Sequence, residues 1–427
     1  MTPELLTTIL KESGATAWEI TDTVTHAREF YFIRHRLDQH RTRNVEHIQV
    51  KVYRAFEGGQ FLGSASEEIH PTATAEEARA QIAGLVQKAS YVRNPAYTLN
   101  RPDGRPALPL TRTDTAATAR AFMETMKALP ETETEFVNSY EIFTEENEIR
   151  FLNSEGIDVR SVRPASMLEV VLNAREGDHE IETYHAFRCG TCDRDALIRE
   201  LSDALRQARD KLHTVPTPAL GACDVVFSTE DAAELYSWFI ARMSAGLKYQ
   251  KISSWAAGEE ILPDTKGDRV TIRSVRELPN SSSNAVYDAE GAPVQDLTLI
   301  ENGVAKDYHG SRQFREYLGM KEGCIASNFV VSGGTRSAEE LRQGDYLEIT
   351  AFSDFSVETA SGAIAGEIRL GYWHHGGEVT PVSGGSISGS MNELARRMHL
   401  SREQKQYNSC LIPMVTRVEG VTLTGAV

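Results

Sequence analysis

The chain has 427 residues, 41% of them apolar, so it can bury a substantial core, and its length favours two or three domains. It carries 45 basic and 61 acidic residues, a formal charge of −16. A field of that sign repels phosphate backbones and anionic lipid, which argues against nucleic-acid and membrane partners. The densest basic run, residues 34–43, also contains Asp38 and is typical of a solvated face.

The cysteine content and the first residues predict the cellular compartment. Five cysteines, an odd number in a long chain, do not form the framework of a secreted disulfide protein. Glu4, Lys11 and Glu12 stand where a signal peptide needs a continuous apolar core. No apolar run approaches the roughly twenty residues that span a bilayer. These features predict a cytoplasmic protein.

The first hundred residues show alternating helix and strand patterns. Residues 3–13 predict a short amphipathic helix. Strands are predicted over 29–34, 47–56 and 60–68. Thr74 and Glu77 form a capping-box pattern that opens a helix over 75–92. The segment 94–114 contains four prolines, and we interpret it as a break between subdomains.

The following hundred residues complete the first half of the chain. Helices are predicted over 115–128 and 194–212. Strands are predicted over 137–144, 148–153, 159–174 and 179–187. Pro216 and Pro218 mark a linker. We therefore predict an α+β protein with a mixed N-terminal region, 1–218, whose helices pack on an antiparallel sheet, and a β-rich C-terminal domain, 219–427.

The second half of the chain contains recognisable turn and capping patterns. Ser228 with Asp231, Ser337 with Glu340, and Ser390 with Glu393 each resemble a capping box. Alternation over 363–370 predicts a strand that buries one face. Gly376 and Gly377 supply a turn, and the helix after Ser390 is expected to continue to Met398.

These elements, and short motifs in a fixed order, resemble the C-terminal domain of the TldD/PmbA family. The matching residues are 353–356, 361–362, 366–368, 381–382 and 386–391. Members of the family were once named modulators of DNA gyrase and are known as metallopeptidase-related proteins. The resemblance implies the same fold class, and it extends more loosely to the N-terminal region.

One helix departs from the pattern of the TldD branch. There the helix after the strand at 223–227 carries HExxxH, whose histidines bind zinc and whose glutamate is the general base. In this chain that helix reads LYSWFIAR over 235–242. Its Trp–Phe–Ile run offers zinc no nitrogen, sulfur or carboxylate ligand. The chain therefore resembles the PmbA branch, also called TldE, which lacks the zinc motif.

This resemblance implies a noncatalytic subunit. It would pair with a zinc-bearing TldD-like chain in a heterodimer and act on extended peptides, in maturation or degradation, with no cofactor or catalytic residue of its own. Two other hypotheses stay open. The chain could be a self-sufficient homodimeric peptidase with an unrecognised metal or nucleophile site, or a peptide-binding scaffold without a proteolytic role.

If zinc is present, the candidate ligands are His185, Cys189, Cys192, His374, His375 and Cys410. Each also has a structural interpretation. His185 lies on an alternating strand about 20 Å from His179, too far to share an ion. Cys189 and Cys192 form a CxxC turn that has no second ligand pair to complete a structural zinc site.

The remaining candidates lie near the C-terminus. His374 and His375 are adjacent on a β segment, so they face opposite ways, and we expect them at an exposed hairpin tip. TldD proteins place a zinc-binding cysteine near the position of Cys410, but the glycine-rich context is missing here, and we interpret Cys410 as a core residue. Tyr372 and Trp373 are candidates for a partner surface.

Overall fold

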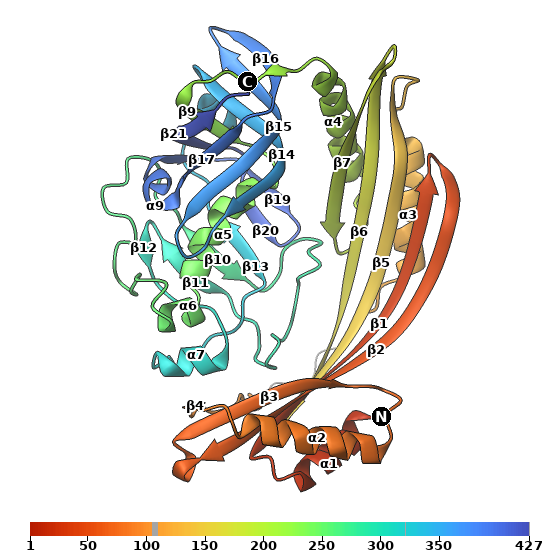
Figure 1. The fold of residues 1–427 in the computed structure, drawn as a ribbon, viewed down its shortest axis with the longest axis vertical. Helices are drawn as coiled ribbons and strands as arrows, with labels where there is room; N and C mark the ends of the chain where they lie inside the picture. The colour runs from red at the N-terminus through yellow and green to blue at the C-terminus, as the bar shows by residue number, and fades with distance from the viewer. Residues whose placement is uncertain (105–109, 321, 427) are drawn as a thin grey trace.

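The structure is a computed structural model that describes residues 1–104, 110–320 and 322–426. A long, curved antiparallel sheet forms one side of the molecule, and a β-rich body packs beside its upper part (Figure 1). The chain begins at one end of the molecule and finishes at the other (Figure 1). The α+β prediction is confirmed.

Four long strands build the curved sheet, whose order is β4-β3-β2-β1-β5-β6-β7. These strands are β1 (Ala17–Ile33), β2 (Arg36–Phe56), β5 (Glu135–Asn153) and β6 (Asp158–Glu176). The sequence predicted shorter strands with breaks between them, for example between 144 and 148, and these breaks are wrong. The charged residues in the middle of β5 are tolerated because β1 and β6 continue the backbone hydrogen-bond ladder on both sides of it.

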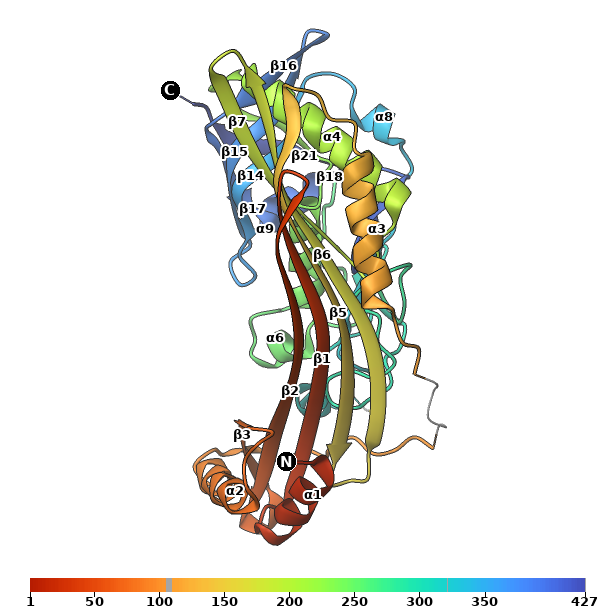
Figure 2. The same cartoon turned by 90° about the vertical axis from the view of Figure 1, so that its right-hand side faces the viewer.

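The lower end of the sheet is covered by two helices (Figures 1 and 2). The elements here are α1 (Pro3–Glu12), η1 (Glu57–Gly59), β3 (Phe61–Ile69), α2 (Ala75–Ala89) and β4 (Asn94–Pro95). The capping box of Thr74 and Glu77 is confirmed, because each side chain accepts the other residue's backbone N–H. Leu6, Ile82 and Leu85 are fully buried between the helices and the sheet.

The upper end of the sheet carries a second pair of helices on one face (Figure 2). These are α3 (Thr115–Ala128) and α4 (Arg194–Leu212), and the edge strand there is β7 (His179–Cys189). The strand β7 pairs with β6 only over residues 166–176 of β6. Residues 158–165 of β6 therefore form a free edge of the sheet within the part of the chain that the structure describes.

Two sheets form the β-rich half, in the orders β12-β11-β10-β13-β20-β19 and β14-β9-β21-β17-β15-β16-β8. Its strands are β8 (Val215–Pro216), β9 (Gly221–Phe227), β10 (Ile272–Val275), β11 (Leu297–Glu301), β12 (Val304–Ala305), β13 (Asn328–Val331), β14 (Tyr346–Val357), β15 (Ala363–His375), β16 (Glu378–Ser383), β17 (Ser386–Ser390), β18 (Met398–Leu400), β19 (Gln404–Tyr407), β20 (Cys410–Pro413) and β21 (Thr416–Thr424).

The helices of this half are short. They are α5 (Ala232–Arg242), α6 (Ala245–Tyr249), α7 (Arg312–Tyr317), α8 (Ala338–Leu341), α9 (Met391–Leu394) and η2 (Ala395–Arg397). Of these, α5 lies at the centre of the largest apolar core, which includes Trp238, Phe239 and Trp255. In the described part of the chain, no helix is both long and apolar enough to cross a membrane.

Two predicted capping boxes do not form, and one predicted hairpin tip starts later than expected. The Ser228 hydroxyl donates to Glu348 at 2.5 Å, and α5 starts after Asp231 without a side-chain cap. Ser390 makes no capping hydrogen bond, and its helix ends at Leu394 before a 3-10 turn. The hairpin tip expected at His374 and His375 begins only after residue 375, so both histidines belong to β15.

Polar contacts join the two sides of the molecule. The Tyr372 hydroxyl on β15 donates to Asp210 of α4 at 2.8 Å. Lys405 on β19 forms an ion pair with Glu200 of α4 at 2.6 Å. Near the lower end, the backbone N–H of Thr98 donates to Glu316 of α7. Side chains from both halves thus hold the curved sheet against the β-rich body.

Candidate functional site

The helix α5 and the strand β20 are neighbours, although they are about 170 residues apart in the sequence. The strand β9 leads into α5, and β20 lies parallel to β13, with Cys410 opposite Phe329. Cys410 packs against the core that contains α5. The structure therefore brings together the two segments that carry the metal ligands in the zinc-binding branch of the family that the sequence resembles.

The two faces of α5 differ in chemistry. Leu235, Tyr236 and Trp238 point into the core and are each 1% exposed. Glu234 and Ser237 are exposed to solvent. The buried face is committed to packing because three large side chains fill it, and the Tyr236 hydroxyl is bonded to Thr416 at 2.6 Å. A ligand could therefore approach α5 only from the side of Glu234 and Ser237.

The Cys410 thiol is held in its protonated form. Burial raises its pKa, and the carboxylates of Glu230 and Glu234 raise it further. A reactive or metal-binding cysteine needs the opposite environment, because the thiolate is the nucleophile and the ligand. Cys410 beside α5 is thus a poor nucleophile at neutral pH, and it packs, partly buried, against the edge of the core.

A zinc ion does not fit the donors that α5 and β20 present. Zinc in proteins takes three or four nitrogen, sulfur or carboxylate ligands at about 2.0–2.3 Å. The exposed face of α5 contributes the carboxylate of Glu234 and no imidazole, and the neighbouring thiol of Cys410 is protonated. Across the described residues, no three histidine, cysteine, aspartate or glutamate side chains lie close enough to hold a metal.

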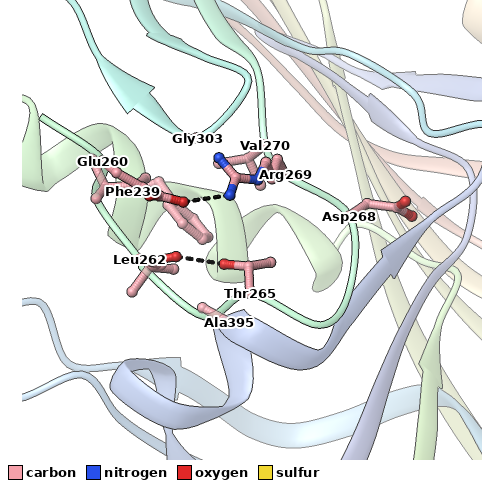
Figure 3. Close-up of a pocket in the computed structure, with 10 residues that line it drawn as sticks. Phe239, Glu260, Leu262, Thr265, Asp268, Arg269, Val270, Gly303 and Ala395 are labelled. Atoms are coloured by element: carbon pink, nitrogen blue, oxygen red, sulfur yellow. Dashed lines mark hydrogen bonds and ion pairs between the residues drawn. The ribbon is translucent and has the colours of Figure 1, made fainter. Parts of the chain in front are cut away.

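A small cavity lies on the buried side of α5 (Figure 3). Phe239 and Arg269 are part of its lining, and its volume of about 10 Å³ is enough for roughly one water molecule. Arg269 pairs with Glu260 at 2.5 Å, and the Thr265 hydroxyl donates to the carbonyl oxygen of Leu262. This cavity is too small for a substrate and belongs to the packing around α5.

The other three candidates, His185, Cys189 and Cys192, lie on β7 or just after it, in the curved-sheet half of the molecule. Burial lowers the pKa of His185 to about 4, so this imidazole is neutral at physiological pH. Burial also raises the pKa of Cys189 to about 12 and that of Cys192 above its usual value. Both thiols pack against the core under α3 and α4. All three are therefore in apolar surroundings that disfavour charge.

The candidates on β15 have partners within the chain. The His374 ring stacks on Tyr346 at 4.2 Å between centroids, and burial lowers its pKa. His375 binds Asp345 at 2.7 Å on the exposed side. Tyr372 is bonded to Asp210 of α4, which leaves Trp373, half-buried beside His375, as the more available member of the aromatic pair.

Comparison with family models decides where the chain belongs. Residues 220–425 match the PmbA/TldA metallopeptidase C-terminal domain, and residues 109–212 match the central domain of the same family. The chain belongs to the PmbA/TldD family. The family resemblance expected from the short motifs between residues 353 and 391 is thereby confirmed.

Curated relatives match over part of their length. The chain is similar to a metalloprotease PmbA homolog of Haemophilus influenzae, 28% identical over 185 residues, which are 41% of this chain and 40% of that protein. An uncharacterised protein of Methanocaldococcus jannaschii is 24% identical over 170 residues, 37% of this chain and 40% of that protein. The chain thus aligns with less than half the length of these relatives.

Solved structures share the PmbA/TldD fold over the whole chain. TldE of Thermococcus kodakarensis superposes with a TM-score of 0.78, at 17% identity, over 99% of this chain and 100% of that one. A putative modulator of DNA gyrase from Bacteroides thetaiotaomicron gives 0.79, at 17% identity, over 99% and 98%. One from Thermotoga maritima gives 0.77, at 18% identity, over 99% of both chains.

Sequence reasoning missed a half-buried carboxyl where the two halves meet. Glu290 lies within the turn from Asp288 to Gly291, and its carboxylate accepts the backbone N–H of Arg312 at 2.7 Å. Burial, followed by the charges of Asp288 and Glu19, raises the pKa of Glu290 to about 7. The turn itself is visible in the sequence, but Glu19 is 271 residues away, and no local pattern connects it with Glu290.

Proposed function

We propose that this PmbA/TldD family member is a noncatalytic, TldE-like subunit that acts with a zinc-bearing, TldD-like partner on extended peptides. The observation that carries the proposal is the chemistry of α5. The exposed side of that helix offers Glu234 and Ser237, and the neighbouring Cys410 thiol is kept protonated. The similarity in fold to a protein named TldE supports the same assignment. The five cysteines are free, which suits a reducing cytoplasm.

In this proposal, the role of each chain follows from the metal-binding side chains that it contains. The partner supplies HExxxH. Its histidines hold a metal that polarises the peptide carbonyl, and its glutamate is the general base. This chain supplies a surface that holds peptide or partner. The two-sided construction of the molecule, with β-rich body and curved sheet joined through Tyr372 and Lys405, provides that surface without a metal of its own.

The first test measures zinc and peptide hydrolysis on the purified, tag-free chain. We expect less than one tenth of a zinc ion per chain after dialysis against a weak chelator, and no cleavage of an unstructured peptide. One zinc per chain, with cleavage that a strong chelator abolishes, would establish the self-sufficient metallopeptidase instead. Cleavage that survives the chelator but is lost in Cys410→Ser would establish a cysteine nucleophile.

The second test is reconstitution with a related chain that carries HExxxH. We expect the two chains to co-elute as one complex that contains one zinc and cleaves peptide. Substituting glutamine for the glutamate of the partner's HExxxH should abolish cleavage and leave the complex intact. If the partner cleaves equally well without this chain and forms no complex with it, the proposed function is wrong.

A further inference from the structure

The free edge of β6 borders a cavity between the two halves of the molecule. Four consecutive β6 residues, 160–163, line one side of it. Glu277 and residues 284–286 of the β-rich half line the other side, and Leu110 and Thr111 complete it. Its volume is about 180 Å³, the space of one or two amino-acid residues. Figure 1 shows that β7 ends part-way along β6, above this stretch.

The backbone of this stretch is available for pairing. Residues 158–165 of β6 pair with β5 on one side, and among the described residues no strand pairs with the other side. Pro164 fits this arrangement, because a proline within a strand is tolerated where its missing N–H would point away from the ladder. Arg160 and Val162 have the same parity as Pro164, so their N–H and C=O groups are directed to the free side.

Arg163 adds a charge that is only partly satisfied. One terminal nitrogen donates to the carbonyl oxygen of Tyr287 at 2.8 Å, but the buried Nε has no hydrogen-bond partner among the described residues. Burial lowers the pKa of Arg163. The nearby carboxylate of Asp288 is already occupied by three backbone N–H groups. A buried guanidinium with an unused donor favours an incoming carboxylate.

The charges around the cavity also favour an anionic group. Arg160 is half-exposed at the rim, 3.9 Å from Glu148, and Glu277 is the single acidic residue in the lining. Val162 and Ala285 provide apolar contacts on either side. The cavity thus combines basic groups with an unpaired strand edge. These features suit a ligand that is an extended peptide with a carboxylate.

We propose that an extended peptide adds to the free edge of β6 and places a carboxylate, terminal or from an acidic side chain, against Arg163. Main-chain hydrogen bonds to Arg160 and Val162 supply affinity with little sequence preference, and the carboxylate fixes the register. This inference extends the proposed function and rests on it for the nature of the ligand. It gives the noncatalytic subunit a defined role, which is to hold one part of the substrate.

The experiment uses the full chain and a fluorescein-labelled hexapeptide, Thr-Val-Thr-Val-Thr-Asp, with binding followed by fluorescence anisotropy. We expect Arg163→Gln to weaken binding about tenfold, the usual effect of losing one hydrogen bond to a charged group. Val162→Pro removes an outward N–H without breaking the ladder to β5, and it should have a similar effect. Arg273→Gln, on an exposed arginine of β10, is the control and should bind as the wild type does.

Changes in the peptide provide a second measurement that does not depend on folding of a variant. Methylation of alternate backbone nitrogens should weaken binding at least tenfold if the peptide adds as a strand. Asn in place of the last Asp, with or without a terminal amide, separates a side-chain carboxylate from a terminal one. If the wild-type chain binds no hexapeptide, or if Arg163→Gln and the methylated peptide both bind normally, the inference is wrong.

The same variant separates this inference from the proposed function. In the reconstituted complex, Arg163→Gln should raise the KM for an acidic peptide about tenfold and leave kcat unchanged, because substrate binding and not chemistry is affected. Cleavage with an unaltered KM would contradict the proposed peptide site at the free edge of β6 but would leave the proposed function supported. If the complex of wild-type chains is inactive, the proposed function is wrong. Peptide binding to the single chain then still tests the proposed site at the free edge of β6.

Discussion

At the scale of single residues, Glu290 has a raised pKa because it is enclosed where the two halves of the molecule meet. It lies within the turn from Asp288 to Gly291, its carboxylate accepts the N–H of Arg312 at the start of α7, and Glu19 and Lys51 of the curved sheet are within electrostatic range. Arg315 of α7 lies within electrostatic range. Burial is the largest cause of its raised pKa, which is about 7 against an ordinary value of 4.5. The folded chain therefore binds this proton more tightly than the unfolded chain does.

We predict that Glu290→Gln removes a pH dependence of stability between about pH 4.5 and 7. Because the folded pKa is raised, the contribution of Glu290 is fully present below the unfolded pKa and is lost as pH rises through the folded value. The neutral amide still accepts the Arg312 N–H but carries no charge. Relative to wild type, the variant should gain roughly 2–3 kcal/mol at pH 8 and little at pH 4.5.

The measurement is urea denaturation of both proteins at four pH values. Glu133→Gln is a suitable control, since that side chain is exposed. A difference between Glu290→Gln and wild type that stays constant from pH 4.5 to pH 8 would contradict the raised pKa. The control variant should follow the wild-type curve throughout.

At the scale of elements, four capping-box patterns show what a local signal can and cannot predict. The boxes at Thr74 and Ser337 form, each with both reciprocal hydrogen bonds. Ser228 has the same pattern, but Glu348 from β14 takes its hydroxyl. The Ser390 hydroxyl instead accepts from the Asn392 side chain at 3.3 Å. A cap is local, so the pattern succeeds unless another side chain, distant like Glu348 or nearby like Asn392, engages the hydroxyl instead.

Two glycines, one in α2 and one on the strand that α2 crosses, distinguish the conformational preference of a helix from its packing. Gly84 lies within α2, and a Cβ added there would meet no atom within 4 Å. Gly63 lies on β3 where α2 crosses it, and a Cβ would stand 2.0 Å from the carbonyl oxygen of Ala89. The first glycine only weakens the helix, whereas the second permits the helix and strand to touch.

We predict opposite effects for the two alanine variants. Gly84→Ala should stabilise the protein by about 0.5–1 kcal/mol, because alanine is the better helix former and restricts the unfolded chain. Gly63→Ala should destabilise it by about 2 kcal/mol or more, since the backbone of α2 must move away. Thermal unfolding of both variants checks this. Equal shifts in the same direction would show that α2 does not rest on Gly63.

At the scale of the whole molecule, polar contacts join the curved sheet to the β-rich body. Tyr372 on β15 donates to the Asp210 carboxylate, which also lies 3.5 Å from Arg206 on the same helix. Its bond is a charge-assisted one in a half-buried place, and burial raises the pKa of Tyr372. Tyr372 therefore acts within the chain as a link to α4, beside Trp373, which stays a candidate for contact with a partner.

We predict that Tyr372→Phe lowers the free energy of unfolding by about 1.5–3 kcal/mol, the usual value of a hydrogen bond to a charged group. Hydrogen exchange should also quicken in α4, because that helix loses a link to the β-rich body. Tyr91→Phe is the control, since Tyr91 is 77% exposed, and it should leave stability unchanged. Unchanged exchange in α4 would mean that Asp210 contributes nothing to the docking.

The sequence by itself determined the fold class, the family and the missing histidines of α5. These properties depend on residue type and local spacing, as the Trp238 to Ile240 run and the cap at Thr74 illustrate. Only the tertiary structure decided the unbroken length of β5, the neighbourhood of Cys410 and α5, the raised pKa of Glu290 and the free edge of β6 beside Arg163. The loop that faces Pro164 lies more than a hundred residues further along the chain. Burial and charge coupling arise between distant segments, so no local pattern could contain them.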